Sequence, residues 1–304
     1  MIMRKLAEEG ADIATIELLI RELIEKSDAV AAAPVGMGQR LYRAVKWDRK
    51  PNSIQEVRYP PAALVKDFGR ANHPGISMFY GAAHPSTPYQ ELNLKSDDKF
   101  AFSIWKIVQP FITFDLGRIY AKELDLDDGV KGGKFAPMNG GSKRFFRAMG
   151  EEFLKEVAIG NEAQYLISST LTKVLLNNFT ADKSKIATPK GEAVKQFGGV
   201  SYPSLCSKHF RENITLLPSI ADHCLLLEEV HYAQCIGYSS DQSHISLLAI
   251  DKATLNSDGS LNWLNLKPRE QEILIERPVD PTELKGRWNA KGTPFNSRGI
   301  STKK

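Results

Sequence analysis

Cysteines and long apolar runs are both scarce in this sequence of 304 residues. The three cysteines, Cys206, Cys224 and Cys235, are too few for a disulfide framework and therefore indicate a reducing compartment. The N-terminus lacks the apolar core of a signal peptide, and runs such as Ile16–Ile20 are far shorter than the roughly 20 residues that cross a bilayer. We therefore expect a cytoplasmic protein that makes no contact with a membrane.

Net charge is small as well, because 40 basic and 36 acidic residues leave +4 at neutral pH. The excess lies in 281–304, which holds six basic side chains and one acidic side chain, so the rest of the chain is close to neutral. A nucleic-acid-binding protein gathers basic and aromatic side chains on one folded face. We therefore expect no direct nucleic-acid binding.

Several widespread catalytic motifs are also absent. The sequence has no G-x-x-x-x-G-K-[ST], no G-x-G-x-x-G after a strand, no H-E-x-x-H and no G-x-S-x-G, so kinases and the hydrolases that use these motifs have no support. A metal site could draw on His223, Cys224, His231 and Cys235, but His231 and Cys235 lie about 13 Å apart if the segment is a strand. Zinc ligands lie within about 2.3 Å of the ion, so we expect no metal.

A helix is predicted over 12–26, where apolar residues recur at helical spacing with charged residues between them. An exposed apolar stripe usually finds a surface, and we expect this one to pack on the body of the chain. Binding of a partner is the less favoured alternative. The stripe consists of Ile13, Ile16, Ile20, Leu23 and Ile24.

Farther along, segments of alternating polarity predict strands, and helical spacing predicts helices over 145–157 and 165–175. Strands mixed irregularly with helices, without a regular βαβ repeat, indicate an α+β fold. We divide the chain into a helical N-terminal extension (1–38), a main domain (39–276) and a basic tail (277–304) that we expect to be flexible. The predicted strands cover 41–45, 76–82, 102–108, 111–116, 198–203, 213–217, 225–235 and 244–250.

Another helix start is marked by Thr87, which suits the N-cap position. Pro88 then takes the first helical position, and Gln90 completes a T-x-x-Q capping box. Glu91 falls in the first turn, where the helix dipole favours its charged form.

Two segments carry more polar groups than a scaffold needs, the run 69–75 (G-R-A-N-H-P-G) and the run 199–204 (G-V-S-Y-P-S). Both lie at the ends of predicted strands, where loops usually carry function. Taken singly, Arg70 fits an exposed loop cation, Tyr80 a core aromatic and Glu91 a helix-start acid. Together with Arg43 and Ser204, they supply two guanidinium groups, a phenol, a carboxylate and a hydroxyl, which suit a phosphorylated sugar.

The order of these segments resembles the RES domain family. The resemblance covers roughly 40–238 and rests on L-Y-R-A (41–44), G-R-x-N-x-P-G (69–75), F-Y-x-A with T-x-x-x-E (79–91), G-V-x-Y-P-S (199–204) and Asn213. It implies an α+β fold similar to ADP-ribosyltransferases, with 39–276 as a NAD-binding catalytic domain. It also implies the toxin of a RES–Xre toxin–antitoxin pair, which consumes NAD+ with an Xre-type antitoxin as partner.

Matching by motif implies a role for each residue. The catalytic residues would be Arg70, Tyr80, Glu91 and Ser204, and NAD+ would be bound by Arg43, Arg70, Tyr80 and Asn213. The chain departs from the family at Pro88, where a small residue is usual, and in its greater length.

These residue types suit cleavage of the nicotinamide–ribose bond. Nicotinamide departs from NAD+ as a neutral molecule, so the positive charge that grows on the ribose is what needs stabilisation, and Glu91 in a dry pocket would supply it. Arg70 and Arg43 would hold the pyrophosphate or inorganic phosphate as a co-substrate. Tyr80 would border the nicotinamide, while Ser204 and Asn213 would orient sugar or phosphate.

We therefore expect a NAD+-degrading enzyme that works by phosphorolysis or hydrolysis. One alternative is an ADP-ribosyltransferase that modifies a protein, and another is a non-catalytic binding protein on the same scaffold.

Overall fold

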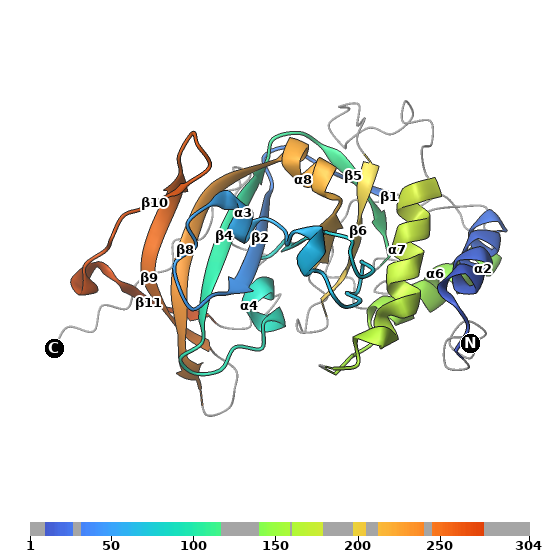
Figure 1. Ribbon diagram of the computed structural model, residues 1–304, viewed down its shortest axis with the longest axis horizontal. Coiled ribbons are helices and arrows are strands. Elements are labelled where there is room, and N and C mark those ends of the chain that lie inside the picture. The colour runs from blue at the N-terminus through green and yellow to red at the C-terminus, as the bar shows by residue number, and fades with distance from the viewer. Residues whose placement is uncertain are drawn as a thin grey trace.

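The computed structural model describes residues 10–26, 32–116, 140–158, 160–178, 197–204, 212–239 and 245–276. Within these ranges the chain forms a large mixed sheet with several helices gathered at one end (Figure 1), which confirms the prediction of an α+β fold. The basic tail predicted for 277–304 lies outside the described residues.

The helices are mostly short, and their bounds follow in chain order. They are α2 (Ile13–Glu25), α3 (Ile54–Val57), α4 (Thr87–Glu91), α6 (Gly140–Phe153), α7 (Leu166–Asn178) and α8 (Pro218–Cys224), with 3-10 turns η1 (Ala62–Leu64), η2 (Glu162–Tyr165) and η4 (Pro268–Glu270).

Eleven strands form the sheet. They are β1 (Ala32–Val35), β2 (Arg40–Lys46), β3 (Phe79–Ala82), β4 (Lys99–Ile107), β5 (Phe111–Asp115), β6 (Phe197–Pro203), β7 (Glu212–Leu216), β8 (Leu225–Tyr238), β9 (Ile245–Leu255), β10 (Leu261–Trp263) and β11 (Glu272–Glu276).

The strand order is β1-β5-β6-β7-β3-β2-β4-β8-β9-β10, with β11 also paired to β9. The pair β5–β6 is parallel and the other pairs are antiparallel. Strands β2 and β3 share a single residue pair, Tyr42 opposite Ala82. The sheet is therefore weakly joined at this point, which we call the seam, and it falls into two halves.

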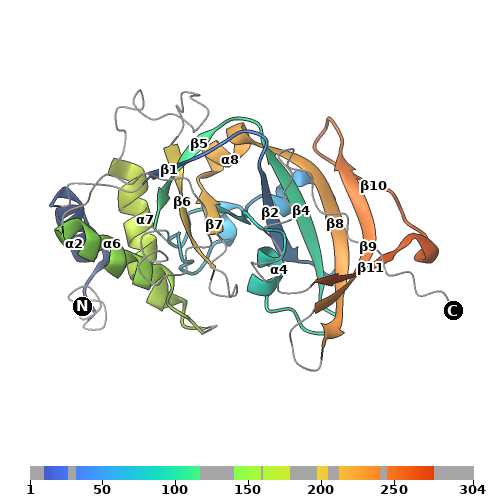
Figure 2. The same ribbon diagram turned by 180° about the vertical axis from the view of Figure 1, so that it is seen from behind.

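One hydrophobic core crosses the seam. Leu41 of β2 and Trp105 of β4 lie in the same buried cluster as Phe79 of β3 and Leu216 of β7. A second core lies in the half from β1 to β3, where α6 and α7 cover β5 and β6 with Phe114 and Phe153 inside. Strands β6 and β7 lie side by side in this half (Figure 2).

Helix α2 packs against α7 through Ile16, Ile20 and Ile24, which are buried. Asp12 caps the helix, because its carboxylate accepts a hydrogen bond from the Thr15 N–H at 2.7 Å. The predicted helix is confirmed. Its stripe packs on this chain through Ile16, Ile20 and Ile24, whereas the other two residues, Ile13 and Leu23, are exposed.

Some elements differ from the sequence-based prediction. The strand predicted over 76–82 begins only at Phe79, because the Ile76 N–H closes a turn to the His73 carbonyl at 3.1 Å. Strand β1 was not predicted, since Ala-Ala-Pro-Val has little β propensity. Its proline is tolerated because β1 lies at the edge of the sheet.

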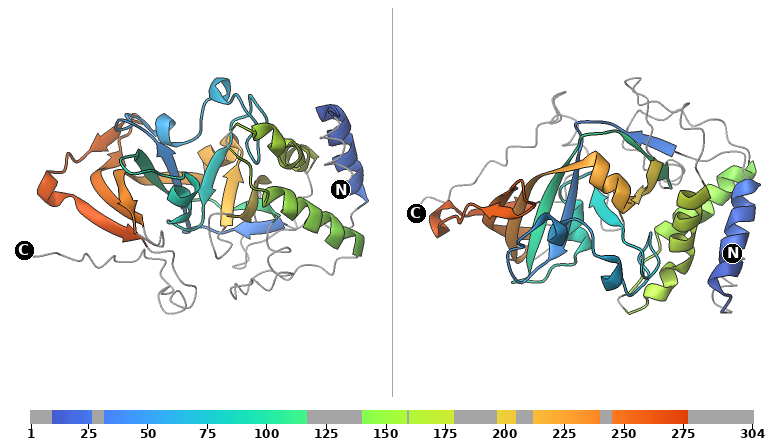
Figure 3. Two further views of the ribbon diagram at one scale, coloured as in Figure 1. Left: turned by 90° about the horizontal axis from the view of Figure 1, so that it is seen from below. Right: turned by 45° about the horizontal axis from the view of Figure 1, so that its top comes forward.

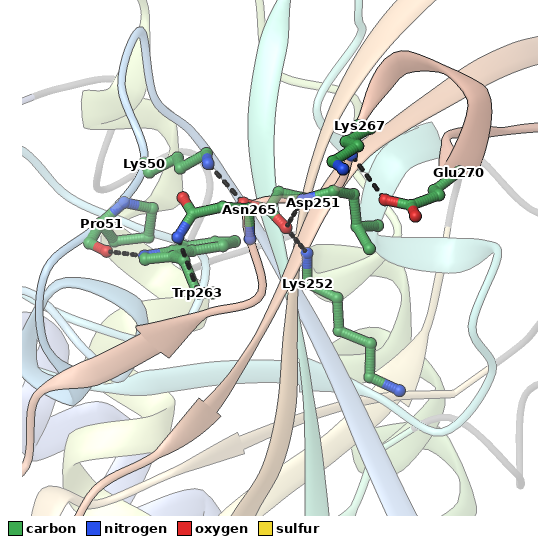
Figure 4. A network of polar contacts seen from close by, with 9 residues as sticks. Lys50, Pro51, Asp251, Lys252, Trp263, Asn265, Lys267 and Glu270 are labelled. Carbon is green, nitrogen blue, oxygen red and sulfur yellow. Dashed lines mark hydrogen bonds and ion pairs between the residues drawn. The ribbon is translucent and has the colours of Figure 1, made fainter.

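A buried carboxylate organises the end of the sheet that lies away from α2, α6 and α7 (Figure 1), and Figure 4 shows its polar contacts. Asp251 on β9 is 1 % exposed and accepts a hydrogen bond from the Lys50 ammonium group. It also accepts the backbone N–H groups of Lys252 at 2.8 Å, Asn265 at 3.1 Å and Leu266 at 3.2 Å. One side chain thereby fixes the segment that leaves β10 against β9.

Candidate active site

Helix α4 positions Glu91, but not in the way that the sequence predicts. The N-cap is Ser86 rather than Thr87, and no side chain caps the helix. Thr87 is fully buried inside the helix, and its hydroxyl has no hydrogen-bond partner among the described residues. The predicted capping box is therefore wrong, and Glu91 is the last helical residue instead of lying in the first turn.

Glu91 is held by two neutral donors, one at the end of β6 and one on β7. The Ser204 hydroxyl donates a hydrogen bond to its Oε1 atom, and the Asn213 amide donates to the same oxygen at 3.0 Å. Oε2 receives no hydrogen bond from the described residues, and the Glu91 side chain is exposed whereas Ser204 is 1 % exposed. One oxygen thus accepts two hydrogen bonds, and the other is held by none of the described residues.

The register of the sheet explains why these residues meet. Asn213 pairs with Tyr202 on β6 and with Ala82 on β3, and Ser204 follows directly after β6. The ends of β3 and β6 therefore lie on either side of the start of β7. Because α4 follows β3 after a short turn, its last residue reaches the two donors.

Tyr80 lies farther along β3 and is tied to the loop that precedes it. Its hydroxyl donates to Asn72 Oδ1 at 2.6 Å and accepts the Ala71 N–H at 3.0 Å. Burial raises the pKa of the Tyr80 phenol well above its ordinary value, so it stays a neutral donor. Gly69 is required here, because a Cβ atom would lie 2.2 Å from Asn72 Oδ1.

Arg70 lies in the same loop, with its guanidinium group directed at the end of α6. It donates to the carbonyl oxygens of Phe153 and, at 3.0 Å, Lys155, and a third N–H donates to the Tyr165 hydroxyl at 3.2 Å. The guanidinium carbon also lies 4.8 Å from the centre of the Tyr165 ring. A guanidinium group has five N–H donors, and the described residues take up three of them, which leaves two that a ligand could accept.

Arg43 lies at the seam on the face of the sheet that carries Phe79, opposite to the face that carries the Tyr80 side chain. It donates to the Tyr80 carbonyl oxygen at 2.9 Å, and its guanidinium carbon lies 5.8 Å from the centre of the Phe79 ring. Burial lowers the pKa of Arg43 to about 10, which leaves it charged at neutral pH. It therefore supports the backbone of Tyr80 where the β2–β3 pairing has ended.

Tyr202 connects the two groups of residues. Its pKa is raised to about 12, chiefly by burial, and it experiences the opposing charges of Arg70 and Glu91. Its hydroxyl accepts a hydrogen bond from the Thr215 hydroxyl at 3.4 Å. Its ring packs on the Phe153 ring, with 5.0 Å between the ring centres. The structure thus brings Glu91, Ser204 and Asn213 into contact with one another. Arg70 and Tyr80 form a second group, which neighbours Tyr202.

Sequence reasoning gave no role to Asn72, Tyr165 or Tyr202. Asn72 and Tyr202 lie inside the two polar runs, 69–75 and 199–204, so their position in these runs is a signal that marks them. Tyr165 is 95 positions from Arg70, and no local pattern marks it.

The residues that the structure describes contain no group of three or more His, Cys, Asp or Glu side chains suited to a metal ion. None of the described helices has the length and apolar character to cross a membrane. No protein-family model matches the chain, and no curated protein matches it.

Proposed function

We propose that this protein cleaves NAD+ at the nicotinamide–ribose bond. The observation that carries the proposal is the fixed carboxylate of Glu91, with Ser204 and Asn213 both donating to one oxygen and leaving the other for substrate. Such a group suits a reaction in which positive charge develops next to it.

The chemistry needs a carboxylate more than a general acid. Nicotinamide leaves as a neutral molecule, while the ribose becomes oxocarbenium-like and attracts the negative charge of Glu91. Because Glu91 is exposed, water screens this attraction until bound NAD+ covers the site. The two donors keep the carboxylate oriented, so it needs no rearrangement during the reaction.

The rest of NAD+ would extend toward Arg70. The two N–H donors of Arg70 that the described residues leave free suit the pyrophosphate, and Tyr165 holds the Arg70 guanidinium group in place. We assign Arg43 to the support of Tyr80 rather than to direct phosphate binding, because it reaches the seam from the opposite face.

The resemblance to the RES domain supports the same conclusion. We infer an ADP-ribosyltransferase-like domain over 39–276 that acts in the cytoplasm as the toxin of a toxin–antitoxin pair, with an Xre-type antitoxin as partner. The mixed α+β sheet with a weak seam is compatible with that fold.

The test is to incubate the purified protein with NAD+, with and without inorganic phosphate, and to separate the products by chromatography. We expect release of nicotinamide, with ADP-ribose formed by hydrolysis or its phosphorylated form by phosphorolysis. Intact NAD+ under both conditions, in protein shown to be folded by circular dichroism, would contradict the proposal.

The exposure of Glu91 favours one alternative acceptor, since a protein side chain can approach an open carboxylate. Transfer of label from adenine-labelled NAD+ to protein would identify an ADP-ribosyltransferase. Label found only in small products would identify a phosphorylase or a hydrolase.

A further inference from the structure

Helix α7 makes two separate contacts with the loop 69–75. Tyr165, at the residue before α7, accepts a hydrogen bond from Arg70 at 3.2 Å. One and a half turns later, the Thr170 hydroxyl lies 3.0 Å from His73 Nε2. His73 and Thr170 are 7 % and 0 % exposed, so this second contact is sealed from water. The position of α7 therefore sets the position of the loop.

Helix α2 covers the outer side of α7 (Figure 3). Its Ile16, Ile20 and Ile24 belong to one buried cluster with Ala71 of the loop and Tyr202 of β6. Glu17 of α2 also forms an ion pair at 2.7 Å with Lys173, which lies one turn after Thr170 on α7. The N-terminal helix is thus joined to the site by both apolar and charged contacts.

We propose that helix α2 is a positioning element of the candidate site, because it holds α7 in the place from which Tyr165 and Thr170 fix the loop 69–75. The group affected is Arg70, together with the Asn72 and Ala71 contacts of Tyr80. Glu91, Ser204 and Asn213 belong to α4, to the end of β6 and to β7, and their link to this support passes through Tyr202 of β6. We therefore expect loosening of α2 to change the binding of NAD+ more than the cleavage step.

The first test is hydrogen exchange of the ligand-free full-length protein, with Ile20→Ala compared with Leu18→Ala. Ile20 is fully buried whereas Leu18, on the same helix, is 59 % exposed. We expect Ile20→Ala to accelerate exchange of the Gly69, Ala71 and Ile76 amides about tenfold through local opening, without a comparable change in β8. Leu18→Ala should leave these amides unchanged.

A milder pair of variants covers the case in which Ile20→Ala fails to fold. Glu17→Gln removes the ion pair with Lys173 of α7 and a pair with Arg21 inside α2. Glu22→Gln removes a pair with Lys26 inside α2 and so controls for the loss of a pair within the helix. We expect faster exchange of the loop amides in Glu17→Gln and not in Glu22→Gln. Unchanged loop amides in a folded variant of Ile20 or Glu17, or uniform acceleration across the whole protein, would overturn the proposal.

The second readout rests on the proposed function. For Ile20→Ala we expect the KM for NAD+ to rise about fivefold or more with kcat nearly unchanged, the pattern of lost ground-state binding. A fall in kcat at constant KM would contradict the positioning role. Failure of the wild-type protein to cleave NAD+ would refute the proposed function alone, because the exchange experiment needs no ligand.

Discussion

At the scale of single residues, Ser204 and Asn213 both donate to one oxygen of the Glu91 carboxylate. That they also orient sugar or phosphate stays a prediction from the sequence. A hydrogen bond to a charged group contributes about 1.5–3 kcal/mol, so losing one donor leaves a mobile carboxylate.

We therefore predict that Ser204→Ala lowers kcat for NAD+ cleavage about tenfold or more, by the loss of about 1.4 kcal/mol or more of stabilisation. In a Glu91→Gln background the same substitution should have little further effect, because the two residues act as a unit. Steady-state kinetics of the two single variants and the double variant measure this coupling. Fully additive effects would show that Ser204 acts on the substrate independently of Glu91.

Gly69 tests the arrangement around Tyr80. An alanine Cβ would lie 2.2 Å from Asn72 Oδ1 and 2.8 Å from the Tyr80 hydroxyl, so the hydrogen bond between them must break. We predict that Gly69→Ala lowers the free energy of unfolding by about 1–3 kcal/mol in urea denaturation. Gly36→Ala is the matched control, since its Cβ would meet no atom within 4 Å. Equal stability of the two variants would be inconsistent with this arrangement.

At the scale of elements, strand β9 and the segment after β10 are joined by the Asp251 carboxylate. Burial acts to raise the pKa of Asp251, but the Lys50 ammonium and the backbone N–H groups of Lys252 and Leu266 outweigh it, and the pKa lies below its ordinary value. The ionised form is therefore the one that stabilises the fold. This contribution is present above about pH 3.9 and is lost as the pH falls through the lower pKa of the folded state.

We predict that Asp251→Asn lowers the free energy of unfolding by about 1–3 kcal/mol at neutral pH, because an amide cannot accept all of these hydrogen bonds. Below pH 4 the variant should lose stability less steeply than the wild-type protein. Urea denaturation between pH 2 and pH 7, with Asp67→Asn as an exposed control, measures both effects. Parallel pH curves for Asp251→Asn and wild type would refute the role of its charge.

The elements differ in how well the sequence predicts them. Helix α2 and strands β4 and β8 follow from periodicity, because each has one face buried and one face polar. Helix α4 begins one residue earlier than the sequence predicts, because Thr87 lies inside the helix and Ser86 takes the N-cap position. A helix this short has no periodicity that could fix its start. Strand β10 is not predicted because its partners in β9, Ala253–Leu255, lie beyond the predicted end at 250. Strand β11 is not predicted although its partners, Ile245–Ala249, lie inside the predicted strand.

At the scale of the whole molecule, the candidate site is assembled from distant parts of the chain. Ser204 is 113 positions from Glu91, and Tyr165 is 95 positions from Arg70. The ordered motifs predict which residues belong together, but the order of strands across the sheet decides which of them touch. That order depends on packing between the two halves, so no local pattern in the sequence contains it.

The carboxylate of Glu91 is central to the proposed reaction, and the most direct measurement is the rate of NAD+ cleavage by Glu91→Gln at saturating NAD+. The substitution keeps the shape and removes the charge, and Glu91 is exposed, so the fold should be unaffected. We predict a rate at least about 100-fold below wild type, as when a charge-stabilising group is lost from an active site. Glu25→Gln, an exposed glutamate on α2, should retain wild-type activity. A Glu91→Gln rate within about threefold of wild type, under about 0.7 kcal/mol, would contradict the account.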